Sequence, residues 1–388
     1  SEENEGVKKS SWTTTQHIDL TRGEEEVANA FNSFSAKLMR EAFNASEKGD
    51  FCISPISTSI VLSMIANAAD EPNCNEICEL LGVTCLDDAK TLCRKLMQYL
   101  PCEENGSCVA LNNSIFMDNN FRMPDEFASE AATWFNADLN LIDFSESSTA
   151  KRIQQWLSES SDGNISTQEC FIPEYTFIDI MFINSVYFKG DWNSKFQRDL
   201  TSTETFFGIR GESTVDMMHQ VVNTYFVEND DFRCVSLNFE DGKNSIELYL
   251  PAEGKNLSDV ISKLSSYTFY DFIQSCVEYK VTLSLPAFKS ATEGWDNTLL
   301  ENMGLKNLRH TDLRQFGIDK ACIEVMQAAS LKVDEDGAEF YALTQTNGEI
   351  ANAPQQCDSV EITFDRPFVY IIRNKTTGAI LLAGAKAN

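Results

Sequence analysis

Residues 177–192 read FIDIMFINSVYFKGDW, and this stretch decides the fold of the chain. Its first twelve residues, 177–188, form a nearly unbroken apolar run. The run is too short and too rich in strand-forming residues to favour a helix. Such a run is typical of a strand with both faces buried in the middle of a sheet. We therefore predict a buried central strand over residues 177–188.

Further strand-like segments follow in the second half of the chain. The last two are separated by residues 374–378, a turn sequence that ends in glycine, so we expect the chain to close with a β-hairpin. The predicted strands cover residues 232–239, 246–250, 279–285, 360–364, 368–373 and 380–385.

Helical patterns lie before and between these strands. Apolar residues recur at three- and four-residue spacing from Val27 to Phe43, and Ser54 and Pro55 open a second helix. The chain has no internal repeat and no linker, so we predict a single α+β domain. Other predicted helices cover residues 86–100, 125–135, 257–264 and 295–303.

The two ends of the predicted domain are set by composition. Residues 1–23 are polar, charged and aperiodic, which predicts a flexible leader followed by one domain over residues 24–388. The acidic start lacks the basic and apolar parts of a signal peptide, so we expect a mature, processed chain. No apolar run approaches the roughly 18 residues that cross a bilayer, so we predict no membrane span.

Net charge narrows the classes of partner. The 388 residues include 59 acidic and 31 basic side chains, for a net charge of −28. This charge repels phosphate backbones and anionic surfaces, so we expect neither nucleic acid nor heparin as a partner. Three bases at helical spacing, Lys90, Arg94 and Lys95, are too few to change that expectation. The 26 phenylalanines supply ample material for a large core.

Twelve cysteines are present, and six of them lie between positions 74 and 108. This local cluster is the better candidate for disulfides. Three residues separate Cys74 from Cys78, and Cys102 and Cys108 flank a turn-like segment. For the other cysteines, buried free thiols are as good an interpretation as disulfides.

No catalytic or metal-binding motif is present. The three histidines, His17, His219 and His310, lack a nucleophile signature around them. There is no phosphate-binding glycine run and no paired-histidine zinc motif. We therefore predict that the protein is not an enzyme and that it uses no cofactor and no metal.

Residues 338–359 form a mostly polar stretch between a strand-like segment and the closing strands. Loops of this length inside a compact fold are uncommon and are usually functional. The first half also alternates in a way that suits a β-strand. The stretch is a loop that could become a strand.

Four motifs occur in one order along the chain and together resemble the serpins, a family of serine protease inhibitors. The resemblance extends over residues 24–388. It implies a fold of three β-sheets, about eight or nine helices and an exposed reactive-centre loop, here residues 338–359. The motifs are FCISPIS at 51–57, NSVYFKGDW at 184–192 with Phe196 after it, VDEDG at 333–337 and FDRPF at 364–368.

The resemblance also implies a mechanism. A protease cleaves the exposed loop and is caught as an acyl-enzyme while the freed loop inserts as a new strand of the central sheet. We therefore predict a monomeric suicide-substrate inhibitor of extracellular serine proteases, with cysteine proteases as secondary targets. The expected location is extracellular, cell-surface or periplasmic.

The hinge of the loop departs from the pattern of inhibitory serpins, which carry a run of small residues after the glycine. Here Phe340, Tyr341 and Leu343 are bulky. If this bulk slows insertion, the protein is instead a non-inhibitory serpin that acts as a carrier, storage or chaperone-like protein. The small side chain of Ala338 favours inhibition. The predicted hinge consists of Glu335, Gly337, Ala338, Glu339, Phe340, Tyr341 and Ala342.

The reactive bond is placed by counting the usual span of the family from Gly337. The count puts Ala351 before the scissile bond and Asn352 after it, with Ile350 as the nearest alternative. A small apolar residue before the bond suits the shallow pocket of elastase-like proteases.

The family pattern further implies a sheet-opening network formed by Ser54, Ser57, Asn184, Gln327 and Trp192, in which position 327 bonds to Asn184 across the sheet opening. Gln327 stands where many serpins have a histidine, and its amide can both donate and accept hydrogen bonds. Ala287 replaces a lysine that often pairs with the counterpart of Glu335. The top of the sheet is therefore expected to open more easily.

Overall fold

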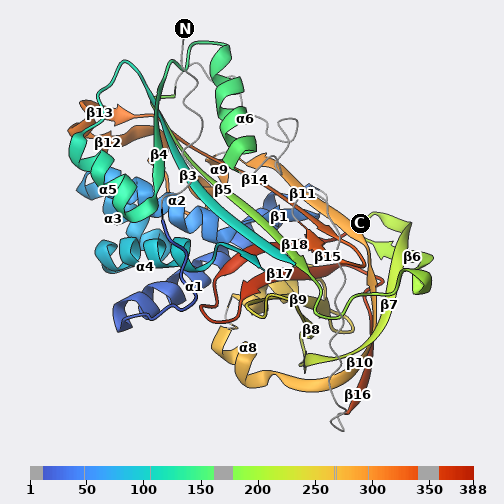
Figure 1. Cartoon of the computed structure of the whole chain (residues 1–388). Helices are drawn as coiled ribbons and strands as arrows, with labels where there is room; N and C mark the ends of the chain where they lie inside the picture. Colours follow the sequence, from blue (N-terminus) through green and yellow to red (C-terminus); the bar gives the residue numbers. More distant parts are fainter. Residues whose placement is uncertain are drawn as a thin grey trace.

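The computed structural model describes residues 12–339 and 358–388, apart from residues 48, 105, 161–177, 266, 268 and 296. This part of the chain contains two large β-sheets, a two-stranded sheet and nine α-helices (Figure 1), which confirms the predicted α+β class. The helices are α1 (Arg22–Ala45), α2 (Pro55–Ala68), α3 (Glu71–Leu81), α4 (Leu86–Tyr99), α5 (Asp125–Phe135), α6 (Ser148–Ser160), α7 (Leu257–Leu264), α8 (Phe269–Ser275) and α9 (Thr298–Asn302), with 3-10 turns η1 (Arg198–Leu200), η2 (Leu308–His310) and η3 (Arg314–Phe316).

A seven-stranded sheet runs through the middle of the molecule (Figure 1). Its order is β11–β14–β15–β5–β3–β2, and β4 also pairs with β3. The predicted central strand is β5, flanked on both sides. The strands are β2 (Cys102–Glu104), β3 (Ser107–Asp118), β4 (Ala137–Ile142), β5 (Ile180–Asp191), β11 (Phe288–Trp295), β14 (Ile323–Val333) and β15 (Gly337–Glu339).

A nine-stranded sheet packs beside it, in the order β1–β18–β17–β9–β8–β7–β10–β16, with β6 paired to β7. The predicted closing hairpin is the antiparallel pair β17 and β18. The strands are β1 (Phe51–Ile53), β6 (Ser202–Gly208), β7 (Gly211–Glu228), β8 (Phe232–Asn238), β9 (Asn244–Pro251), β10 (Val277–Pro286), β16 (Ser359–Thr363), β17 (Phe368–Asn374) and β18 (Ile380–Lys386), and the small separate sheet pairs β12 (Thr311–Leu313) with β13 (Ile318–Ala321).

Both faces of β5 are buried, as its apolar run predicts. Phe182 and Phe188 belong to the main core, whereas Met181 and Ile183 point to the other face and pack with Trp156 of α6. A strand covered on both faces needs apolar residues at nearly every position. This explains why the sequence signal for β5 is so strong.

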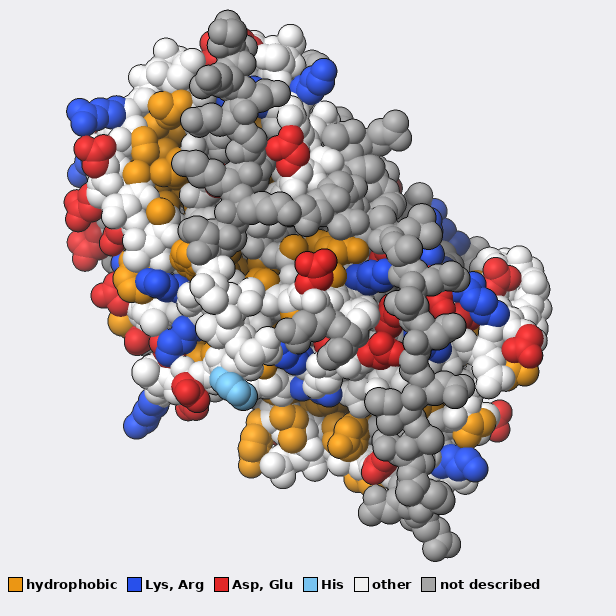
Figure 2. Space-filling view, in the orientation of Figure 1, with side chains coloured by type: hydrophobic (Ala, Val, Ile, Leu, Met, Phe, Trp, Pro, Cys, Tyr) orange, Lys and Arg blue, Asp and Glu red, His pale blue; other side chains and the backbone are white. Residues whose placement is uncertain are grey.

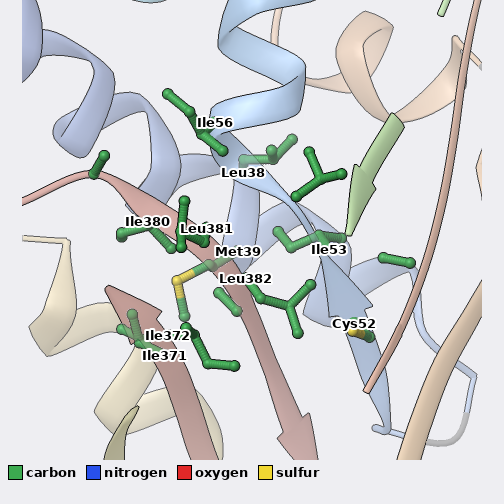
Figure 3. Close-up of a cluster of buried hydrophobic side chains, with 14 of the residues drawn as sticks. Leu38, Met39, Cys52, Ile53, Ile56, Ile371, Ile372, Ile380, Leu381 and Leu382 are labelled. Atoms are coloured by element: carbon green, nitrogen blue, oxygen red, sulfur yellow. The ribbon is translucent and has the colours of Figure 1, made fainter. Parts of the chain in front are cut away.

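Helix α2 links the two large sheets because it packs against both β5 and β18. Pro55 occupies its first turn, where a missing N–H costs nothing. Nearly every residue of the helix is buried. In Figure 3, Ile56 lies with Leu38 and Met39 of α1 and Leu381 of β18. The main core therefore lies where helix α2 packs between the two large sheets.

Two parts of the sequence prediction miss the observed elements. The longest described strand, β7, carries no alternating apolar pattern, and half of its residues are exposed, including Val221 and Tyr225. Trp295 ends β11 and does not begin a helix, because β11 pairs with β14; the helix α9 starts later, at Thr298.

Residues 12–21 lie against α4, and α1 begins at Arg22, inside the span expected to be a leader. The Thr15 amide donates to the Gln98 carbonyl at 2.8 Å. The Lys95 ammonium donates to the Asp19 carbonyl, also at 2.8 Å. The first eleven residues of the predicted leader lie outside the described part. No helix of that part is long and apolar enough to cross a membrane.

The expectation of disulfides in the local cysteine cluster is wrong for the described residues. None of Cys74, Cys78, Cys102 and Cys108 forms a disulfide. In the β2–β3 pair, Cys102 lies opposite Val109, so neighbouring Cys108 points to the other face of the sheet. Two thiols on opposite faces cannot bond without moving the backbone.

Candidate functional site

The predicted hinge begins as a strand inside the central sheet. β15 lies between β5 and β14, antiparallel to both. Ala338 pairs with Gly190 on one side and Val333 on the other. Its side chain is completely buried. The first residues of the loop are therefore part of the sheet.

The two strands that flank β15 come together farther along. β5 and β14 pair directly, in parallel, over 180–183 and 323–326. Between this contact and β15, the described pairings leave residues 184–188 of β5 and 327–331 of β14 without a neighbour on the sides that face each other. We call this part of the sheet the slot. One end of the slot is closed and the other is occupied by β15.

Two glycines allow β15 to enter the sheet. A Cβ atom on Gly337 would lie 2.1 Å from the carbonyl oxygen of Gly190, which is backbone and cannot move aside easily. A Cβ on Gly190 would lie 2.6 Å from the ring of Phe239. Only glycine fits at these two positions without displacing neighbours.

Trp192 anchors the turn that connects β14 to β15. Its backbone amide donates to the Asp336 carbonyl at 2.9 Å, and its indole Nε1 donates to the Asp334 carbonyl at 2.8 Å. The indole ring is buried and stacks on Phe239, with centroids 5.0 Å apart. The Phe196 amide donates to the Glu335 carbonyl at 3.0 Å. Every carbonyl of the turn 334–336 is therefore held by the segment after β5.

The carboxylates of the same turn also have partners. Lys332 Nζ lies 2.7 Å from Asp334 Oδ2, and Thr201 Oγ1 donates to Glu335 Oε1 at 2.9 Å. Arg198 forms an ion pair with Asp336 and lies 3.9 Å from Glu335. The Asp336 carboxylate raises the pKa of Arg198 above its usual value. Position 287 is an alanine and offers Glu335 no lysine partner. The contacts of Glu335 come instead from Thr201 and from Arg198 of η1.

Glu339 is the half-buried last residue of β15. Its cross-strand neighbours are Lys189 and Lys332, yet its Oε1 atom accepts no hydrogen bond from the described residues. Burial raises the pKa of this carboxyl, and the two lysines oppose the rise only in part. Asp334 and Asp191 add to the rise. The ionised carboxylate is therefore poorly accommodated in the hinge strand.

The residues of the predicted polar network lie on different elements under the slot. Ser54 Oγ donates to the Leu381 carbonyl at 2.7 Å, and Asn184 Nδ2 donates to Asn113 Oδ1 at 2.7 Å. The Oδ1 atom of Asn184 is buried and accepts no hydrogen bond from the described residues. Ser57 is buried in α2, which packs against β5. The side chain of Gln327 lies outside the described part.

Several predicted site residues cannot be placed. The rest of the hinge, Phe340, Tyr341 and Ala342, lies outside the described residues, as do Leu343 and the reactive-bond positions. Conversely, the contacts of Arg198, Thr201 and Lys332 with the turn 334–336 were not predicted. The reactive-bond positions are Ile350, Ala351 and Asn352.

Replacing Gly337 by Ala should prevent the observed pairing of β15. The new methyl group would overlap the Gly190 carbonyl, so we expect a loss of about 1–3 kcal/mol in stability. Chemical denaturation measures the loss, and amide hydrogen exchange of residues 337–339 should become faster. Ser359→Ala, at an exposed position of β16, is the control and should change neither. Unchanged exchange in Gly337→Ala would contradict the observed close approach.

The pairing of β15 should depend on pH through Glu339. Because its pKa is raised on burial, the stability of the buried hinge is fully present below the ordinary value of 4.5 and is lost as pH rises through the raised pKa. Hydrogen exchange of the hinge should thus show more protection at mildly acidic pH than at neutral pH, after correction for intrinsic rates. Glu339→Gln should remove this dependence, whereas Glu278→Gln on β10 should retain it. A pH dependence that survives in Glu339→Gln would exclude this carboxyl as its source.

The chain is similar to known proteins. The family model described as serpin (serine protease inhibitor) matches residues 29–388. An uncharacterized serpin-like protein of Thermococcus kodakarensis is 28% identical over 390 residues, which cover 98% of this chain and 90% of that protein. The leukocyte elastase inhibitor of Xenopus tropicalis is 26% identical over 378 residues, with 93% and 98% covered.

The fold is similar to that of tengpin, a thermophilic serpin solved in its native state. The TM-score is 0.84 at 22% identity, and 97% of each chain is covered. The predicted fold of three sheets with about eight or nine helices is thereby confirmed. A family model that spans nearly the whole chain is consistent with the four sequence motifs. The chain belongs to the serpin family.

Proposed function

We propose that this serpin is a suicide-substrate inhibitor of serine proteases. The observation that carries the proposal is the position of β15, which occupies one end of a slot that the next residues of the chain could fill. A protease that cleaves the loop forms an acyl bond to the residue before the cleavage. Insertion of the freed loop then carries the protease along the sheet before the ester is hydrolysed.

The register of β15 specifies how insertion would continue. Ala338 faces Gly190 and Val333, so position 340 would lie between Phe188 and Leu331. Both of these side chains are buried in the main core. Since alternate residues of a strand share a face, Phe340 would enter that core. An aromatic side chain there adds apolar burial to the free energy of insertion.

The slot also offers unused hydrogen-bonding capacity. Buried backbone groups almost always find partners, and the pairings of the described residues leave one side each of residues 184–188 and 327–331 unpaired. The buried Oδ1 of Asn184 on β5 is a further acceptor in the same region. We propose that Gln327 and an inserted strand supply these missing partners, with Ser54 and Ser57 below them.

We propose Ala351–Asn352 as the scissile bond and elastase-like serine proteases as targets, with cysteine proteases as secondary targets. A small apolar side chain at position 351 fits the shallow specificity pocket of elastase-like proteases. The leukocyte elastase inhibitor among the relatives has a name that agrees with this preference. We further propose that the protein acts as a monomer in an extracellular, cell-surface or periplasmic location, where such proteases are met.

Heparin and nucleic acid are not part of the proposal. The bases of α4 already have partners within the chain. Lys95 Nζ lies 2.7 Å from the buried carboxylate of Glu24, and Arg94 lies over the rings of Trp12 and Trp134. With a net charge of −28, a polyanion would have to displace these contacts against repulsion.

One polar cluster resembles a catalytic array. His219 lies 2.9 Å from Ser284 Oγ and 2.8 Å from Glu204 Oε1. These residues stand on three adjacent strands, and the regular pairing of β10 with β7 and β16 engages the backbone around Ser284. Paired amides cannot stabilise an oxyanion. We therefore propose that the protein is not an enzyme.

The alternative is a non-inhibitory serpin with a carrier, storage or chaperone-like role. It rests on the bulk of Phe340, Tyr341 and Leu343 in the hinge. Slow entry of these side chains would let the protease hydrolyse the acyl bond first. The loop would then be cleaved without capture of the protease.

Incubation with pancreatic elastase tests the proposal. We expect a complex that survives denaturing electrophoresis and a released carboxy-terminal fragment that starts at Asn352. Ala338→Arg is the matched variant: its charge would have to enter the core beside Gly190, so it should be cleaved without complex formation. The thermal midpoint should rise after cleavage of the wild type only. Cleavage of the wild type with no complex and an unchanged midpoint would favour the alternative.

The specificity assignment has its own test. Ala351→Arg should move inhibition from elastase to trypsin, whose pocket binds a basic side chain. We expect the second-order rate constant with elastase to fall by at least about 100-fold. Ile350→Arg is the control. If this variant inhibits trypsin and Ala351→Arg does not, the scissile bond is Ile350–Ala351.

A further inference from the structure

Strand β7 exposes two large apolar side chains close to β16. Val221 is 57% exposed and Tyr225 is 45% exposed, whereas Thr224 between them is buried. Since alternate residues of a strand share a face, Val221 and Tyr225 both lie on the outer face of the nine-stranded sheet. Such a face is usually polar, because apolar side chains there add nothing to the core. These two side chains are therefore candidates for contact with another molecule.

The neighbouring strands place charged side chains around this apolar pair. Tyr225 lies opposite Glu278 of β10, and position 282 of β10 lies between Val221 and Glu361 of β16. Residues directly opposite each other share a face of the sheet, and all of these side chains are exposed. We call this face the outer patch. It consists of Val221, Tyr225, Glu278, Lys280 and Glu361.

The outer patch is tied to the proposed scissile bond by a short length of chain. Ser359 of β16 pairs with Lys280 of β10, and two strand spacings of about 10 Å separate β16 from β7. From Asn352 to Ser359 the chain can span at most about 25 Å, whatever its path. A protease domain of about 240 residues has a radius of gyration of about 18 Å. A protease bound at Ala351–Asn352 can therefore reach the outer patch.

Carboxylates border the apolar pair. Glu278, Glu361 and Asp358 are exposed there together with Lys280. The whole chain carries a net charge of −28. A negative field attracts basic partners and speeds their encounter with the protein. The partner that fits the outer patch thus has an apolar area bordered by basic side chains.

We propose that the outer patch is an exosite, which means a contact surface for the target serine protease in addition to the loop. The inference rests on the proposed function, because it adds a specificity element for the same partner. In the encounter complex, Val221 and Tyr225 contact the protease while its cleft binds the loop. A contact linked to another benefits from a high effective concentration. The exosite thereby distinguishes between proteases that share one type of specificity pocket.

The exosite acts before the loop inserts. The outer patch belongs to the nine-stranded sheet, whereas the slot belongs to the seven-stranded sheet. A change in the patch should therefore slow the attack on the loop without changing the number of inhibitor molecules consumed per protease captured. This difference separates loss of the exosite from damage to the insertion mechanism.

A second exposed apolar group supplies the matched control. Tyr270 and Ile273 of α8 are 69% and 50% exposed. In Figure 2, hydrophobic side chains reach the surface along the lower edge of the molecule, where Figure 1 shows α8. Tyr270 lies on a helix and not on the sheet face that carries β16. Its truncation removes as much exposed aromatic surface as truncation of Tyr225, but away from the outer patch.

Kinetics of the full-length protein with pancreatic elastase test the proposal. The double variant Val221→Ala with Tyr225→Ala should lower the second-order rate constant of loop cleavage by roughly tenfold. Its thermal midpoint and the stoichiometry of inhibition should stay unchanged, because both side chains are exposed and remote from the slot. Tyr270→Ala should behave as the wild type. Higher salt should slow the reaction of the wild type, because it screens the carboxylates of the patch.

The outcomes separate this proposal from the proposed function. Cleavage without a covalent complex, slower in the double variant, would refute inhibition and support the exosite. Complex formation at equal rates in the wild type and the double variant would overturn the exosite and leave inhibition standing. Equal slowing by Tyr270→Ala would also overturn it. If elastase does not cleave the loop at all, both the choice of target and the exosite for it are wrong.

Discussion

Two strands of the central sheet, β5 and β14, are neighbours at one end and are held apart by β15 at the other. The rest of the structure depends on this divergence. Backbone amides and carbonyls are strong hydrogen-bonding groups that are costly to leave unmade when buried. Residues 184–188 pair with β3 on one side, and the pairings of the described residues give them no neighbour on the side that faces β14. A strand that continued β15 into the slot would therefore have a defined direction and register.

The junction at the top of this slot determines what can enter it. Trp192 and Phe196 hold the carbonyls of the turn 334–336, so the chain after β14 is aimed back into the sheet. Gly337 and Gly190 remove the side chains that would block close approach. Glu339 opposes burial by its charge. Backbone geometry therefore favours the position of β15 at the entrance of the slot, whereas the Glu339 carboxylate disfavours it.

The sequence predicts the parts of this site that have local signals. The run 177–188 identifies β5 because burial on both faces demands apolar residues throughout. The contacts of Thr201 and Trp192 with the turn are different: they join residues 134 and 142 positions apart, and neither leaves a periodic pattern. The family motifs point to Trp192 and Glu335 separately. Only the folded structure shows that these two residues meet in one junction with Arg198 and Phe239. Strand β7 is missed for the opposite reason, since half of its side chains are exposed and its buried residues do not alternate regularly.

The pairing of β16 with β10 has a consequence for timing. The chain that leaves β15 at Glu339 is caught again at Ser359, where β16 runs parallel to β10 in the other large sheet. The intact chain is therefore tied at both ends, and full entry into the slot would require β16 to leave its own sheet. Breaking one peptide bond between the two anchors removes that requirement at once. In the proposed mechanism, covalent continuity of the chain between the two anchors restrains insertion, and the protease that cleaves the chain is the one close enough to be captured.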